Sequence, residues 1–252
     1  MDPSIEDTKG IVTGFVSVLW TIWFGLLLFF IGLPTVLWVI VRPLSPATIN
    51  HARFSARVLL RLTGWYPKLY GFNNFDTSEP SVVICNHNSY LDGLVVFAFL
   101  PPHFRFVIKK EMQQIPLIGR YLEHIGSLFV ERNNPSEAGK TARQILGALN
   151  KGHSVVFFAE GTRTRPHGIG AFKEGPFVLA ARKQIPIIPM ALTGTRQALK
   201  AGQWLARPSQ LVLQALPTIE CTGSGRNNAQ TILDKTRQAI LSATGEPDLA
   251  QA

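Results

Sequence analysis

The chain has 252 residues, of which 46% are hydrophobic and 16% are charged, and its formal net charge at pH 7 is +9. This length suits one domain with a full core, but so few charges are unusual for a freely soluble protein. A basic surplus favours an anionic membrane surface, a phosphorylated ligand or nucleic acid as partner. The two cysteines, Cys85 and Cys221, are too few for a disulfide framework and show no zinc spacing, so a reducing compartment is expected.

The first element is an apolar run over residues 11–41 that contains no Asp, Glu, Lys, Arg or His. Roughly 20 apolar residues span a bilayer, so this run is long enough. A signal peptide is disfavoured because the start is acidic and no small-residue cleavage site follows. Since Gly32-Leu33-Pro34 interrupts the run, it either spans both leaflets or turns back within one, and a buried soluble helix is the remaining alternative.

Ser45-Pro46 predicts the start of a second helix that runs to Leu62. Arg53, Arg57 and Arg61 recur on it at four-residue spacing, which indicates either a basic stripe at the level of the lipid headgroups or an ordinary solvated face. Because positive charge follows the apolar run, the larger C-terminal part is expected on the cytoplasmic side of the membrane.

From about residue 66, strand and helix patterns alternate, which predicts an α/β domain with a mixed central sheet flanked by helices. The expected strands are Val82–Cys85, Phe104–Ile108, Ser127–Glu131, Ser154–Ala159, Ile187–Leu192 and Leu211–Leu216. The expected helices are Leu91–Leu100, Leu117–His124, Ser136–Asn150, Gly175–Lys183 and Arg226–Ala243. Residues 1–64 would then form membrane-associated helices, 65–244 the α/β domain and 245–252 a disordered tail.

Within this domain, the strand Val82–Cys85 ends in Asn86-His87 and is followed by Ser89-Tyr90-Leu91-Asp92. A histidine at a strand end with a carboxylate five positions later can form a His–Asp pair in which Asp92 orients His87 as a general base. The competing interpretation is structural, because Ser89-x-x-Asp92 also has the shape of a helix-capping box.

Three further stretches place polar residues or prolines at strand ends, where open α/β sheets build their sites. They are Gly126 to Arg132, the Glu160-Gly161-Thr162-Arg163 segment with Lys173 soon after it, and Ile185-Pro186-Ile187-Ile188-Pro189. In the third, the two prolines are expected to prevent ordinary ladder pairing.

Taken in this order, the four stretches resemble the conserved blocks of the glycerolipid acyltransferase family, over roughly residues 65–220, and specifically its lysophosphatidic acid acyltransferases. The sequence departs from the family pattern at Ala159, where many members have Pro, and at Glu131, where several have Asp. The resemblance implies transfer of a fatty acyl group from acyl-CoA or acyl-carrier protein to a lysophospholipid at a membrane, such as the bacterial inner membrane. It implies neither a metal nor a further cofactor.

The resemblance also assigns expected roles to individual residues. His87 and Asp92 are the expected catalytic pair. Arg163 is the best candidate to bind the acceptor phosphate, because a guanidinium can grip phosphate with two hydrogen bonds. Glu160 would bind an acceptor hydroxyl or brace Arg163. The remaining candidates for substrate binding are Gly161, Thr162, Arg132 and Lys173; Arg132 could instead pair with Glu131 or another carboxylate, and Lys173 could lie in a solvated loop.

Other functions remain open at this stage. The acceptor could be another lysophospholipid or a lyso-ornithine lipid, and a thioesterase could use water at the same pair. A catalytically silent lipid-binding protein would not need the pair. Nucleic-acid binding has the charge but no motif, and the hydrophobicity argues against it.

Overall fold

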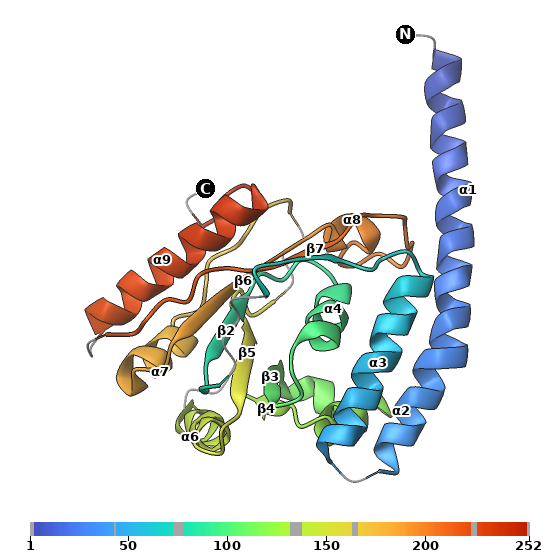
Figure 1. Ribbon diagram of the computed structural model, residues 1–252. Helices are drawn as coiled ribbons and strands as arrows, with labels where there is room; N and C mark the ends of the chain where they lie inside the picture. Colours follow the sequence, from blue (N-terminus) through green and yellow to red (C-terminus); the bar gives the residue numbers. More distant parts are fainter. Residues whose placement is uncertain are drawn as a thin grey trace.

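A computed structural model describes residues 3–42, 44–72, 78–131, 138–162, 166–222 and 226–250 (Figure 1). Within these ranges the chain forms a seven-stranded sheet with the order β1-β7-β6-β2-β5-β3-β4. Neighbouring strands run parallel except β6 and β7, so the predicted mixed sheet is confirmed. The strands are β1 Lys68–Tyr70, β2 Val82–Cys85, β3 Phe104–Lys109, β4 Leu128–Val130, β5 Ser154–Phe158, β6 Ile187–Thr193 and β7 Val212–Ala215.

Helices cover both faces of this sheet because its central strands are apolar on both sides. All four residues of β2 are fully buried: Val83 and Cys85 join the core beneath α3 and α4, while Val82 and Ile84 join the core beneath α6, α7 and α9. The helices of the domain are α3 Pro46–Leu62, α4 Leu91–Phe99, α5 Ile118–His124, α6 Ala138–Leu149, α7 Gly175–Lys183, α8 Thr195–Ala198 and α9 Arg226–Thr244, with a 3₁₀ turn at Lys110–Gln114.

The N-terminal apolar run is one continuous helical rod made of α1 Pro3–Leu27, a π-helical turn Leu28–Gly32 and α2 Leu33–Ile40. Its part Thr13–Ile40 is long and apolar enough to cross a membrane, and few of its side chains are buried. The chain does not reverse at Gly32–Pro34, because Pro34 occupies the first turn of α2, where its missing N–H costs least. The reversal follows Val41, and α3 returns beside α2 (Figure 1).

The start of α3 agrees with the sequence, since Ser45 caps it by accepting a hydrogen bond from the Thr48 amide. Two of the three arginines in the predicted headgroup stripe instead bond within the domain, whereas Arg61 is exposed. Arg53 donates from Nε to the Phe97 carbonyl at 3.2 Å, and Arg57 donates to the Ala98 carbonyl at 2.8 Å. Both carbonyls lie in the last turn of α4, where the helix dipole attracts cations, so these two arginines fasten α3 to α4.

Residues 245–250 are not the disordered tail that the sequence predicted. The Ile169 amide donates to the Pro247 carbonyl at 2.9 Å, and the Leu249 amide donates to the Ile169 carbonyl at 3.0 Å. Arg237 of α9 also forms an ion pair with Asp248. The chain after α9 is therefore fastened to the loop around Ile169. The predicted division at residue 64 stays a prediction, although α3 shares its buried core with α4.

Candidate active site

The site lies at the carboxyl ends of the adjacent parallel strands β2 and β5. From β2 the chain leads to α4 on one face of the sheet, and from β5 it leads to α7 on the other, which creates the crevice where α/β sheets bind ligands. Asn86 fixes the first loop, because its side-chain amide donates to the Leu192 carbonyl and accepts from the Leu192 amide, both at 2.8 Å. The loop is thus tied to β6 directly before His87.

His87 and Asp92 form the pair that the sequence predicted. His87 Nδ1 lies 2.9 Å from Asp92 Oδ2, and their side chains are 19% and 1% exposed. When the proton is on Nδ1, His87 donates to Asp92 and its Nε2 is left as an acceptor. The ring stacks on Phe158, with centroids 4.3 Å apart, which limits its rotation.

The capping interpretation is met only in part, because Tyr90 and not Ser89 stands at the N-cap position of α4, but some of its hydrogen bonds are present beside the His87–Asp92 pair. Asp92 Oδ2 accepts from the Asn88 and Ser89 amides at 2.6 and 2.7 Å, while Ser89 Oγ accepts from the Leu91 amide at 3.1 Å. The two backbone N–H groups hold this buried carboxylate in one orientation. The start of α4 therefore orients the same oxygen that contacts His87.

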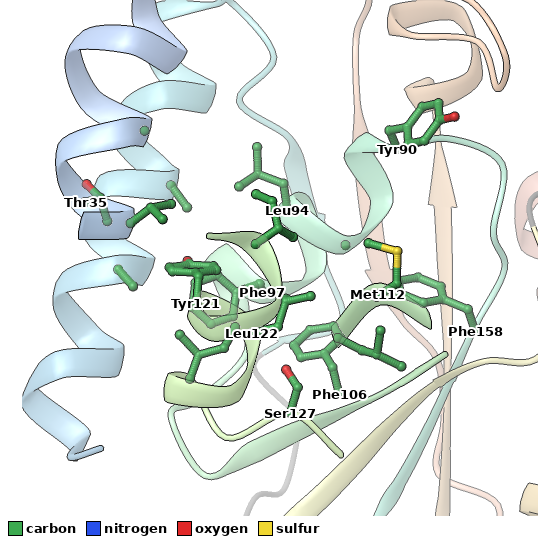
Figure 2. Close-up of a pocket in the computed structure, with 18 of the residues that line it drawn as sticks. Thr35, Tyr90, Leu94, Phe97, Phe106, Met112, Tyr121, Leu122, Ser127 and Phe158 are labelled. Atoms are coloured by element: carbon green, nitrogen blue, oxygen red, sulfur yellow. The ribbon is translucent and has the colours of Figure 1, made fainter. Parts of the chain in front are cut away.

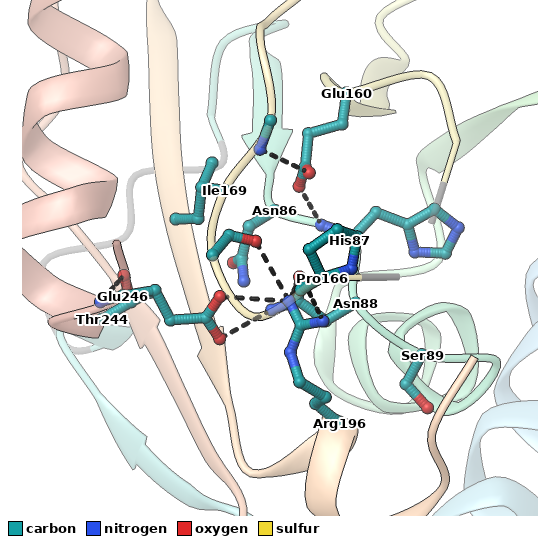
Figure 3. Close-up of polar contacts among 12 residues, drawn as sticks. Asn86, His87, Asn88, Ser89, Glu160, Pro166, Ile169, Arg196, Thr244 and Glu246 are labelled. Carbon is teal, nitrogen blue, oxygen red and sulfur yellow. Dashed lines mark hydrogen bonds and ion pairs between the residues drawn. The ribbon is translucent and has the colours of Figure 1, made fainter. Parts of the chain in front are cut away.

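Glu160 is almost completely buried and links two loops (Figure 3). Its Oε1 accepts from the His87 amide at 2.8 Å, and its Oε2 accepts from the Gly170 amide at 2.9 Å. Neither contact was predicted from the sequence, which suggested an acceptor hydroxyl or Arg163 as the partner of Glu160. Cys85 behaves as the small buried hydrophobe that was expected, and burial raises the pKa of its thiol well above the ordinary value.

An apolar cavity of about 520 Å³ opens beside His87 (Figure 2). Phe158, Gly161 and Thr162 line it near the histidine, and the N-terminal helices line it on the opposite side. The walls between them are almost entirely hydrophobic; they include Leu94, Phe97, Phe106, Met112, Tyr121, Leu122 and Ile125. Such a space suits an alkyl chain better than a polar metabolite.

The remaining predicted site residues either lie outside the described ranges or do not line the cavity. Arg132 and Arg163 lie outside the described residues. The Lys173 amide donates to the Ala159 carbonyl at 2.9 Å, but its side chain is exposed and does not line the cavity. Pro189 lies in β6 opposite Ile84 of β2, and its carbonyl accepts from the Leu216 amide at 2.9 Å. The expectation that this proline prevents ladder pairing is therefore wrong.

Sequence reasoning missed Arg196 and Glu246, whose side chains meet next to the pair of His87 and Asp92. One signal was present for the arginine: Gly194-Thr195-Arg196 follows β6 directly, and the same three residue types, Gly161-Thr162-Arg163, follow β5 after two intervening residues. No local pattern marked the glutamate.

A family model described as "Acyltransferase" matches residues 67–193, which is just over half of the chain. The chain belongs to this acyltransferase family. The chain is 30% identical over 191 residues to a putative 1-acyl-sn-glycerol-3-phosphate acyltransferase of Caenorhabditis elegans, covering 74% of this chain and 67% of the relative. It is 33% identical over 133 residues to a chloroplastic 1-acyl-sn-glycerol-3-phosphate acyltransferase of Arabidopsis thaliana, covering 52% of this chain and 37% of the relative.

The fold of the chain also matches a crystal structure. The match is to the lysophosphatidic acid acyltransferase PlsC of Thermotoga maritima, with a TM-score of 0.72 and 18% sequence identity, covering 90% of this chain and 94% of the other. At this identity the likeness shows the fold alone.

Proposed function

We propose that the protein transfers a fatty acyl group from an acyl thioester to the sn-2 hydroxyl of lysophosphatidic acid, giving phosphatidic acid. The observation that carries this proposal is the His87–Asp92 pair at the edge of an apolar cavity of about 520 Å³. The pair supplies a base, and the cavity accepts a chain that water would not solvate. The reaction in the names of the curated relatives supports the choice of acceptor.

In the proposed mechanism, Nε2 of His87 takes the proton of the acceptor hydroxyl while the hydroxyl oxygen attacks the thioester carbonyl carbon. The carbon–sulfur bond then breaks, and the proton passes to the departing thiolate. Asp92 holds the imidazole by its Nδ1–H and stabilises the imidazolium that forms. A positioned base contributes about 10²–10⁴ in rate. This route needs no acyl-enzyme.

The acceptor phosphate is assigned to Arg163, with Gly161 and Thr162 adding backbone and hydroxyl donors from the cavity rim. Arg163 directly follows Thr162 in the chain, although it lies outside the described residues. Arg132 is a second candidate. Lys173 is a weaker one because its side chain is exposed and does not line the cavity.

The decisive experiment offers the purified protein a radiolabelled acyl thioester with and without lysophosphatidic acid. Acyl transfer that needs the lipid, and that is lost in His87→Ala with the fold intact, supports the proposal. Release of free fatty acid alone would identify a thioesterase, and a strong preference for a phosphate-free lysolipid would reject the acceptor. Near-normal turnover by folded His87→Ala would overturn the mechanism.

A second experiment tests the phosphate assignment. Arg163→Ala should raise the KM for the acceptor more than about tenfold, because a charge-assisted bidentate contact contributes about 1.5–3 kcal/mol. Arg163→Lys should recover part of the loss, since lysine keeps the charge but not the fork. The KM for the donor should change much less. Equal damage to both substrates would place Arg163 at the donor or in the scaffold.

The donor is assigned to acyl-CoA or acyl-carrier protein, and the site of action to the membrane surface. The exposed apolar rod Thr13–Ile40 supports membrane attachment. The expected location is a bacterial inner membrane with the α/β domain in the cytoplasm. Recovery of the full chain in the soluble fraction without detergent would contradict this assignment, and labelling near Asp2 in sealed vesicles distinguishes one leaflet from two.

A further inference from the structure

Three side chains from distant parts of the chain form a closed cluster beside His87 (Figure 3). Asn88 Oδ1 accepts from Arg196 Nη2 at 2.7 Å, and Asn88 Nδ2 donates to Glu246 Oε1 at 3.0 Å. Arg196 Nη2 and Glu246 Oε2 complete the ring at 3.2 Å. The three residues come from the loop after β2, from α8 and from the segment that follows α9.

Burying the charges of this cluster is unfavourable unless all three side chains are present. The side chains of Arg196 and Glu246 are only 9% and 11% exposed. Removing one partner of a buried pair leaves the other charge without compensation. A residue that served only to attach the end of the chain would not need such a pair, because apolar contacts achieve this at lower cost.

Arg196 also reaches the loop that holds Glu160. Its Nη1 donates to the Pro166 carbonyl at 2.5 Å and its Nη2 to the Gly168 carbonyl at 3.1 Å. The terminal segment packs so closely on this loop that a Cβ at Gly168 would lie 2.6 Å from the Pro247 carbonyl oxygen. The amide of Gly170 then holds Glu160, which accepts from the His87 amide.

The cluster therefore meets the catalytic loop from two sides. On one side it fixes the side chain of Asn88, whose amide donates to Asp92. On the other it fixes the loop through which Glu160 holds the backbone of His87. We propose that Arg196 and Glu246 are positioning residues that hold His87 and Asp92 in register, so that residues 245–250 complete the active site. The kinetic consequences rest on the function proposed above.

An exchange of groups tests this positioning role. Asn88→Asp alone places two carboxylates about 3 Å apart, and Glu246→Gln alone leaves Arg196 without its charged partner. Combining Asn88→Asp with Glu246→Gln swaps the amide and the carboxylate, so the net charge and all three contacts are restored. Glu220→Gln is the matched control, because it makes the same chemical change at an exposed site at the opposite end of β6.

Two readouts are needed, both on the full chain in detergent. The first is the kinetics: each single variant should lower kcat by about tenfold to a hundredfold with little change in either KM, because a misplacement of about 1 Å at a reacting group costs that much. The double variant should recover most of the loss, and the control should match wild type. The effects of the two substitutions would then not add, which is expected only if the residues are in direct contact.

The second readout is amide hydrogen exchange in the peptide that spans Asn86 to Asp92. Exchange there should be faster in both single variants and return to the wild-type rate in the double variant. If the singles lower only the thermal midpoint and leave kcat and local exchange unchanged, the positioning role is overturned. Failure of the double variant to recover local exchange would overturn it too. If the wild type transfers no acyl group, the proposed function fails, while the exchange measurement still decides on the cluster.

Discussion

The cavity beside His87 predicts that a bulky side chain on its far wall shortens the acyl chain that the enzyme accepts. Thr35 of α2 lines the cavity on the side opposite Phe158 (Figure 2). Its hydroxyl donates to the Ile31 carbonyl at 2.7 Å, so this hydrogen bond stays within the helical rod and does not connect it to another element. Thr35→Phe should therefore fill part of the cavity while the His87–Asp92 pair stays in place.

The size of the effect follows from the volume that is lost. Phenylalanine has about four more side-chain heavy atoms than threonine, so it displaces roughly four methylene groups of a bound chain. Each buried methylene contributes about 0.8 kcal/mol, which makes the loss roughly 3 kcal/mol. Since 1.4 kcal/mol is a factor of ten, kcat/KM for the longest donors should fall roughly 100-fold to 200-fold. Donors too short to reach α2 should be unaffected.

The assay measures kcat/KM for a series of saturated acyl thioesters, with lysophosphatidic acid held constant. Thr35→Val removes the hydroxyl and keeps the size, and Leu37→Phe places the same ring on the exposed face of α2; both should keep the wild-type chain-length profile. A uniform loss in Thr35→Phe across all chain lengths, or no loss at all, would refute the view that this cavity holds the acyl chain.

Three further predictions concern catalysis and stability. Asp92→Asn should lower kcat by several orders of magnitude while folding is retained, because an amide favours the wrong imidazole tautomer; steady-state kinetics check this. Arg57→Ala should lower the free energy of unfolding by about 1.5–3 kcal/mol, since the last turn of α4 loses a charged donor, and denaturant titration in detergent measures it. Burial, and next the charge of Arg105, lower the pKa values of His103 and His153 in the folded state. The unfolded chain therefore takes up protons first, so stability should be full above about pH 6.5 and decline below it, and His153→Gln should flatten that decline in thermal midpoints.

The sequence by itself determined the elements whose signals are local. Val82–Cys85 is an unbroken apolar run that ends abruptly in polar residues, and β2 has these bounds. Gly175–Lys183 begins with Gly-Pro and ends in basic residues, and α7 has these bounds too. The pairing of His87 with Asp92 could also be predicted, because five residues separate them and the turn into α4 brings them together. The short exposed strand β1 carried no such signal and was missed.

Tertiary structure alone decided which distant groups meet. The contact of Glu160 with the His87 amide joins positions 73 residues apart, and the contact of Asn88 with Glu246 joins positions 158 residues apart. The sequence predicted that Arg53 and Arg57 face the membrane, but in the structure both donate to carbonyls at the end of α4. Periodicity and capping act within a few residues, so they predict an element and its ends. The partner of a charged side chain depends on how the elements pack. A buried charge without a partner has a high free energy, and only the packing of distant elements brings a partner to it.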